Sequence, residues 1–123
     1  MTKRQLERRV RAVVHDVVAA LPPDLRALAE GVPVVCEWEM ADHWLDEGVA
    51  DDALALFSGP ALDEPADPMC LEAPRITFFL AALWDYSGAD EAMFDAEARL
   101  TYLHEFGHYL GLDEAALEAR GLL

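Results

Sequence analysis

Residues 104–114 read His-Glu-Phe-Gly-His-Tyr-Leu-Gly-Leu-Asp-Glu, close to the end of the 123-residue chain. The segment 90–110, which leads into this stretch, repeats apolar and small residues at steps of three and four: Met93, Ala96, Leu100, Leu103, Gly107 and Leu110. That spacing predicts a helix with one apolar face. Gly111 is expected to end the helix in the left-handed conformation, so that the chain turns back behind it.

His104 and His108 stand four residues apart in this predicted helix. Such residues are separated by about 40° around the axis and about 6 Å along it, so both imidazoles project from the same side. Their nitrogens can then meet one zinc ion at about 2.0–2.1 Å. Glu105 is turned by about 100° from His104. We therefore expect Glu105 to act as general base on a water molecule beside the metal, and not as a ligand.

A third ligand is expected among the carboxylates that follow Gly111. A chain that reverses at this glycine brings a carboxylate two or three residues later back towards the histidines. Asp113 and Glu114 both occupy such positions, and their adjacency leaves the choice between them open. A set of imidazoles and one carboxylate suits zinc best among the divalent cations. The sequence thus predicts a zinc site made by His104, His108 and one of these two acids.

The N-terminal half predicts two helices and a strand. Residues 3–20 carry apolar side chains at helical spacing, and Pro23 can start a short second helical segment that runs through Ala29. Residues 32–40 are rich in β-favouring types and predict a strand. Residues 75–80 predict a second strand on the same grounds. Residues 81–86 are expected to extend that strand.

The remaining segments are less regular. Residues 41–57 predict short helical or irregular pieces, with Asp51 as an N-cap. Residues 58–74 contain four prolines among acids and predict a long loop, and residues 113–119 predict a last short helix. At this length we expect a single domain over residues 1–123.

The stretch 104–114 resembles the signature of the small bacterial zincin-like metallopeptidases, predicted zinc proteases with a minimal metalloprotease-like domain. The resemblance extends to the N-terminal helix that ends in Leu21-Pro22-Pro23, to the Val-rich strand and to the Ile76-Thr77-Phe78 strand. It implies an α+β fold in which a small mixed sheet packs against the active-site helix.

The resemblance also implies roles for single residues. His104 and His108 match the zinc ligands and Glu105 matches the general base. Glu114 stands three positions after the motif's glycine, where metzincins place a third histidine and the small family usually has an acid, so it is the first choice for the third ligand, with Asp113 as the rival. In zincins an edge strand binds extended peptide by main-chain pairing; residues 75–80 fit either that role or a plain core strand.

The chain is strongly acidic, with 24 Asp and Glu against 9 Lys and Arg and a net charge of −15. This charge argues against nucleic acid and against an anionic membrane surface as partners. Residues 1–11 are basic by contrast; we interpret them as a solvated helix face, with a small nucleic-acid arm as the alternative.

No apolar run of about 18 residues and no signal-peptide pattern is present. Cys36 and Cys70 are the only cysteines, and they lack the close spacing of a metal or redox pair. We interpret both as buried free thiols, which predicts a cytoplasmic protein.

The expected activity is metal-assisted hydrolysis of a peptide or amide bond in a peptide or protein substrate. One alternative is a binding or scaffold protein that keeps zinc for stability and has no turnover, and another is a metal-free acidic interaction module. Glu105 favours the enzyme, because a structural zinc site needs ligands but no base.

Overall fold

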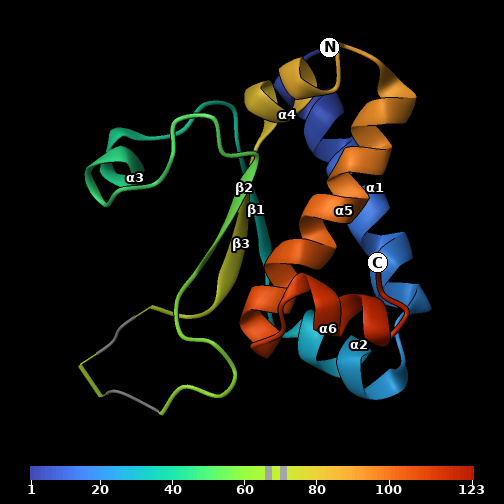
Figure 1. Cartoon of the computed structure of the whole chain (residues 1–123). Helices are drawn as coiled ribbons and strands as arrows, with labels where there is room; N and C mark the ends of the chain where they lie inside the picture. Colours follow the sequence, from blue (N-terminus) through green and yellow to red (C-terminus); the bar gives the residue numbers. More distant parts are fainter. Residues whose placement is uncertain (66–67, 70–71) are drawn as a thin grey trace.

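The computed structural model describes residues 1–65, 68–69 and 72–123. The long helices α1 and α5 lie side by side on one face of a small sheet, and α3 lies on the other side (Figure 1). In chain order the elements are α1 (Lys3–Ala20), α2 (Pro23–Glu30), β1 (Val34–Glu37), α3 (Asp42–Asp46), β2 (Ala55–Ser58), β3 (Arg75–Phe79), α4 (Leu80–Tyr86), α5 (Glu91–Leu110) and α6 (Glu114–Ala119).

The sheet has the strand order β1-β3-β2 and is mixed. β1 runs parallel to β3 with Val34 opposite Ile76, and β2 runs antiparallel to β3 with Leu56 opposite Thr77. The expected α+β fold, a small mixed sheet packed against the helix that carries the histidines, is confirmed. β3 is the central strand, so the interpretation of residues 75–80 as a peptide-binding edge is wrong and that of a core strand is right.

Two further predictions are wrong. Residues 55–58 form β2 and Asp51 lies in a turn, where we expected helical or irregular pieces capped by Asp51. The backbone of β2 gains its partners from β3, a contact distant in sequence that local propensity does not register. Residues 80–86 form helix α4 and do not extend β3, since the Ala81-Ala82-Leu83 run near their start favours a helix.

The helix boundaries follow from local chemistry. Thr2 caps α1 in a reciprocal capping box with Gln5, in which each side chain bonds the other residue's backbone N–H. The Asp90 side chain accepts a 2.9 Å hydrogen bond from the Met93 N–H at the start of α5. Gly111 ends α5 with φ 75° and ψ 24°, the left-handed conformation that we expected there.

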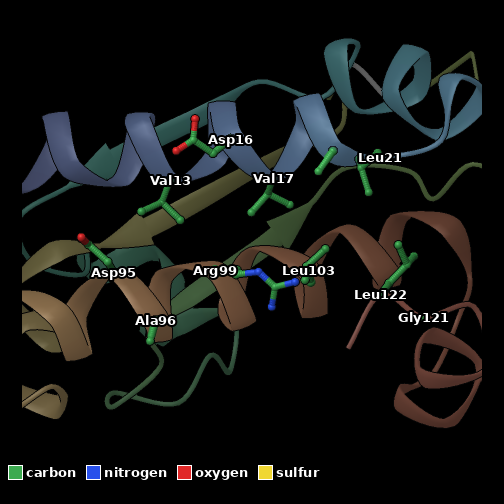
Figure 2. Close-up of a pocket in the computed structure, with 11 residues that line it drawn as sticks. Val13, Asp16, Val17, Leu21, Asp95, Ala96, Arg99, Leu103, Gly121 and Leu122 are labelled. Carbon is green, nitrogen blue, oxygen red and sulfur yellow. The ribbon is translucent and has the colours of Figure 1, made fainter.

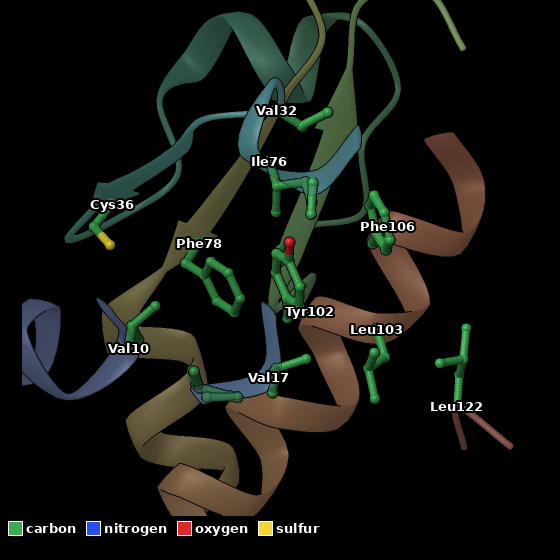
Figure 3. Close-up of a cluster of buried hydrophobic side chains, with 14 of the residues drawn as sticks. Val10, Val17, Val32, Cys36, Ile76, Phe78, Tyr102, Leu103, Phe106 and Leu122 are labelled. Carbon is green, nitrogen blue, oxygen red and sulfur yellow. The ribbon is translucent and has the colours of Figure 1, made fainter. Parts of the chain in front are cut away.

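The core lies between the sheet and the pair α1 and α5 (Figure 3). Leu6 and Val10 of α1 are fully buried in it, as is Phe106 of α5. At the surface the Arg9 guanidinium binds both carboxylate oxygens of Asp95, at 3.1 and 2.8 Å, and so joins α1 to α5. The helix pair is thereby held both by apolar burial and by a two-point charged contact.

Burial also governs two ionisable groups in this core. It raises the pKa of the Cys36 thiol to about 11 and that of the Tyr102 hydroxyl to about 12. The prediction of a buried free thiol is confirmed for Cys36, whereas Cys70 lies outside the described residues. In the described parts of the chain no helix is long and apolar enough to cross a membrane.

Candidate active site

Helix α5 presents His104 and His108 together at its C-terminal end. The two ring centroids are 4.8 Å apart, and both side chains are about half exposed. The rings thus lie side by side, one helical turn apart, as their spacing predicts. They share a hollow of about 480 Å³ whose lining is completed by residues from the chain's return: Gly111, Leu112, Asp113, Glu114 and Leu117.

Glu105 is buried next to these rings and is tied to the sheet. Its Oε2 accepts a 3.0 Å hydrogen bond from the Phe57 backbone N–H and lies 3.1 Å from Nδ1 of His108. The Phe79 N–H donates to the Leu54 carbonyl, so the backbone groups of Leu54 point towards β3. Along an antiparallel strand this direction alternates from residue to residue. The backbone groups of Phe57, three positions after Leu54, therefore point away from β3. Glu105 therefore binds the outer edge of β2.

The Phe57 contact is a part of the site that sequence reasoning missed, because β2 itself was not predicted. The signal in the sequence is the short apolar run Ala55-Leu56-Phe57, which ends at a Ser-Gly-Pro turn. Such a run is consistent with a short strand, but the aspartates before it also favour a helix start.

The chain returns to the histidines through α6. The Asp113 side chain caps this helix and accepts a 2.8 Å hydrogen bond from the Ala116 N–H. Glu114 lies next in the chain, and its Oε1 is 3.3 Å from Nδ1 of His104. Of the two candidate acids, one is thus engaged within its own helix and the other lies against a histidine of α5.

Gly107 permits this close approach of α6. A Cβ at its position would lie 2.7 Å from Cδ1 of Leu117 and 3.3 Å from the Leu112 carbonyl oxygen, both closer than ordinary van der Waals contact. The glycine thus allows α6 to approach α5 closely. It also fixes the depth at which α6 sits against α5.

A second hollow lies elsewhere. A groove of about 550 Å³ lies between α1 and α5, and Val17, Leu103 and Arg99 are among the residues that line it (Figure 2). The described residues that line this groove are different from those around His104 and His108. The groove therefore belongs to the packing of the helix pair and not to the candidate site.

The residues at the histidines fit zinc by the chemistry of their donors, since two imidazoles and a carboxylate are ligands that zinc prefers. Across residues 1–65, 68–69 and 72–123, no group of three or more His, Cys, Asp or Glu is arranged so that it could hold a metal ion. His108 contacts Glu105 and His104 contacts Glu114. The histidines thus pair with separate carboxylates through Nδ1, which leaves the Nε2 atom of each ring to bind an ion.

Comparison with known protein families gives a match over most of the chain. The model of a family described as zincin-like metallopeptidases matches residues 29–122, from the end of α2 through α6. No curated protein is significantly similar to the chain. The match covers more than half of the chain and includes the helix of His104 and His108, β2 with its Glu105 contact, and the return through α6. The chain therefore belongs to the zincin-like metallopeptidase family.

Proposed function

We propose that the protein is a zinc-dependent peptidase in which His104, His108 and Glu114 hold the metal and Glu105 is the general base. The observation that carries this proposal is the return of α6, which brings Glu114 to within 3.3 Å of His104 beside the second histidine. The substrate is a peptide or protein, and the charge of −15 favours one that is positively charged.

The contacts of the two acids support Glu114 as the third ligand. The Asp113 carboxylate accepts the Ala116 N–H, and a ligand role would compete with this cap. The Glu114 side chain is 73% exposed, and among the described residues its carboxylate forms an ion pair with His104 alone. Its carboxylate can therefore turn towards an ion without a loss to α6.

Glu105 is positioned for proton transfer. Its Oε2 is held by the Phe57 N–H, and none of the described residues hydrogen-bonds its Oε1. Oε1 can take a proton from a water molecule that attacks the scissile carbonyl and can deliver it to the leaving amine. Zinc, when bound, supplies Lewis-acid polarisation of the carbonyl and lowers the pKa of water to about 7. The Phe57 contact restricts the carboxylate's rotation, so that Oε1 keeps one direction.

The test combines metal content with hydrolysis. The purified full chain is loaded with zinc, its metal stoichiometry is measured, and cleavage of a fluorogenic peptide library is followed. We expect one zinc per chain and cleavage that a chelator abolishes. Glu105→Gln should keep the zinc and the fold but lower the rate by about 10²–10⁴-fold, the contribution typical of a general base.

Glu118→Gln is the matched control, because it makes the same chemical change at an exposed acid of α6 outside the hollow. It should retain full activity. Equal activity in Glu105→Gln and Glu118→Gln would overturn the role of the base. A zinc-loaded protein that cleaves no peptide and unfolds when zinc is removed would favour the zinc-stabilised scaffold instead.

A further inference from the structure

A third pocket lies between α1, α2 and β1. Its volume is about 430 Å³, within the range of small-molecule sites. Tyr102 contributes to it from α5 and is turned by about 200° around the helix from His104, so the pocket lies on the opposite side from the candidate active site. Its apolar walls are formed mainly by small aliphatic side chains: Val14, Val18, Ala19, Ala29, Val32 and Val34.

Tyr102 brings an unpartnered polar group to this pocket. Its side chain is 1% exposed, and the hydroxyl is directed towards the end of the core where Val32 and Ile76 lie (Figure 3). No described residue forms a hydrogen bond with this hydroxyl. The hydroxyl is therefore available as a donor to a molecule in the pocket that Tyr102 lines.

Arg26 also lines this pocket and carries a second unpartnered polar group. Its Nε is buried and has no hydrogen-bond partner, and its Nη2 reaches only the Leu21 carbonyl, at 3.4 Å. The chain has 24 acidic residues, yet no carboxylate of a described residue pairs with this guanidinium, although Glu30 lies one helical turn away. A guanidinium without a carboxylate partner attracts an anion locally, against the net negative charge of the protein.

The rest of the lining sets the charge of that anion. Arg11 and His15 of α1 also line the pocket, and Arg11 is already engaged with the Val34 carbonyl and with Glu7. Glu30 is the acid among the lining residues and repels a second negative charge. A singly charged anion therefore suits the pocket better than a dianion such as phosphate.

We propose that this pocket binds a small monocarboxylate that carries an apolar tail. The Arg26 guanidinium supplies the positive charge and N–H donors, Tyr102 supplies a hydroxyl donor, and the aliphatic walls cover the tail. A planar guanidinium can bind both oxygens of a carboxylate with two parallel hydrogen bonds. The site is independent of the proposed peptidase site, since the two pockets share no described residue.

The test uses octanoate as the probe and octanamide as its neutral control, each titrated into the full chain. Binding is followed by calorimetry and by backbone amide chemical shifts. Octanoate should saturate with shifts at Val14, Val18 and Val32, and octanamide should bind about tenfold more weakly, the factor expected for loss of a charge-assisted hydrogen bond.

Variants locate the donors. Arg26→Gln should weaken octanoate binding about tenfold and octanamide binding little, and Tyr102→Phe should weaken octanoate binding by a few-fold. Arg99→Gln, in the groove between α1 and α5, is the matched control and should change neither. Zinc content and peptide cleavage should be unchanged in Arg26→Gln, so failure of this proposal is distinguishable from failure of the peptidase.

Three outcomes would overturn the proposal: equal affinity for octanoate and octanamide, shifts confined to the α1–α5 groove, or no saturable binding. If Arg26→Gln proves to be unstable, Arg26→Lys provides the second variant. It keeps the charge but not the fork of donors, and its octanoate affinity should fall between that of the wild type and that of the double variant Arg26→Gln with Tyr102→Phe.

Discussion

Glu105 of α5 accepts the Phe57 backbone N–H at 3.0 Å, which ties the proposed base to the outer edge of β2. The same bond satisfies a backbone donor of the edge strand. A change at this position therefore affects the attachment of β2 to α5 as well as the proposed base, and two substitutions separate the effects.

Glu105→Ala leaves the Phe57 N–H without its partner, whereas Glu105→Gln still offers it a side-chain carbonyl oxygen. We expect Glu105→Ala to lower the free energy of unfolding by about 1–3 kcal/mol and Glu105→Gln to lower it by less than about 1 kcal/mol. Urea unfolding measures both. Equal losses would show that the Phe57 bond does not stabilise the fold.

Zinc affinity should distinguish Asp113 from Glu114, the two candidate ligands at the start of α6. Glu114→Gln is expected to weaken zinc binding by at least about tenfold, since even partners outside the ligand set change metal affinity 10–100-fold. Asp113→Asn should leave it nearly unchanged, because asparagine also caps a helix. Competition with a chromogenic chelator gives both constants. A larger effect of Asp113→Asn would make Asp113 the ligand.

Gly107→Ala should displace α6. Alanine favours the helix by about 1 kcal/mol, but its Cβ would lie 2.7 Å from Leu117, and overpacking of this kind costs about 1–3 kcal/mol. We expect a net loss of up to about 2 kcal/mol together with weaker zinc binding, because Glu114 moves with α6. Adding Leu117→Ala should restore part of the zinc affinity, and purely additive effects would contradict this coupling.

Alkaline pH should destabilise the fold through Cys36 and Tyr102. Both pKa values are raised by burial, from 9.0 to about 11 and from 10.0 to about 12, so the folded state keeps protons that the unfolded chain releases. The stability that these two protonated groups contribute to the fold is complete below pH 9 and is lost as the pH rises towards 12. Unfolding free energies measured across this range should fall, and Tyr102→Phe should reduce the fall above about pH 10. A flat profile would contradict the raised pKa values.

The sequence predicted best what depends on neighbouring residues. α1 and α5 show regular apolar spacing, and the ends of α5 follow from the Asp90 cap and the left-handed Gly111. His104 and His108 share one side of α5 because four residues nearly complete a turn. Periodicity and capping are local properties, and they are readable without knowledge of the fold.

What the sequence did not predict depends on distant contacts. β2 is four residues long and owes its conformation to β3, so residues 51–57 suggested helical pieces instead. β3 is central because β1 flanks it on one side and β2 on the other. Since β2 was not predicted, the sequence left open whether β3 is an edge strand. The contact between Glu105 and Phe57 joins α5 to β2, so it could not be predicted without β2.

The family match begins at residue 29, yet α1 provides Leu6 and Val10 to the core and Arg9 to the bond with Asp95. A fragment trimmed to the matched boundary would expose the apolar back of the histidine helix to water. Recombinant work on this protein, and sequence searches for others built like it, should therefore retain the leading helix, since the histidine helix relies on it as a structural support.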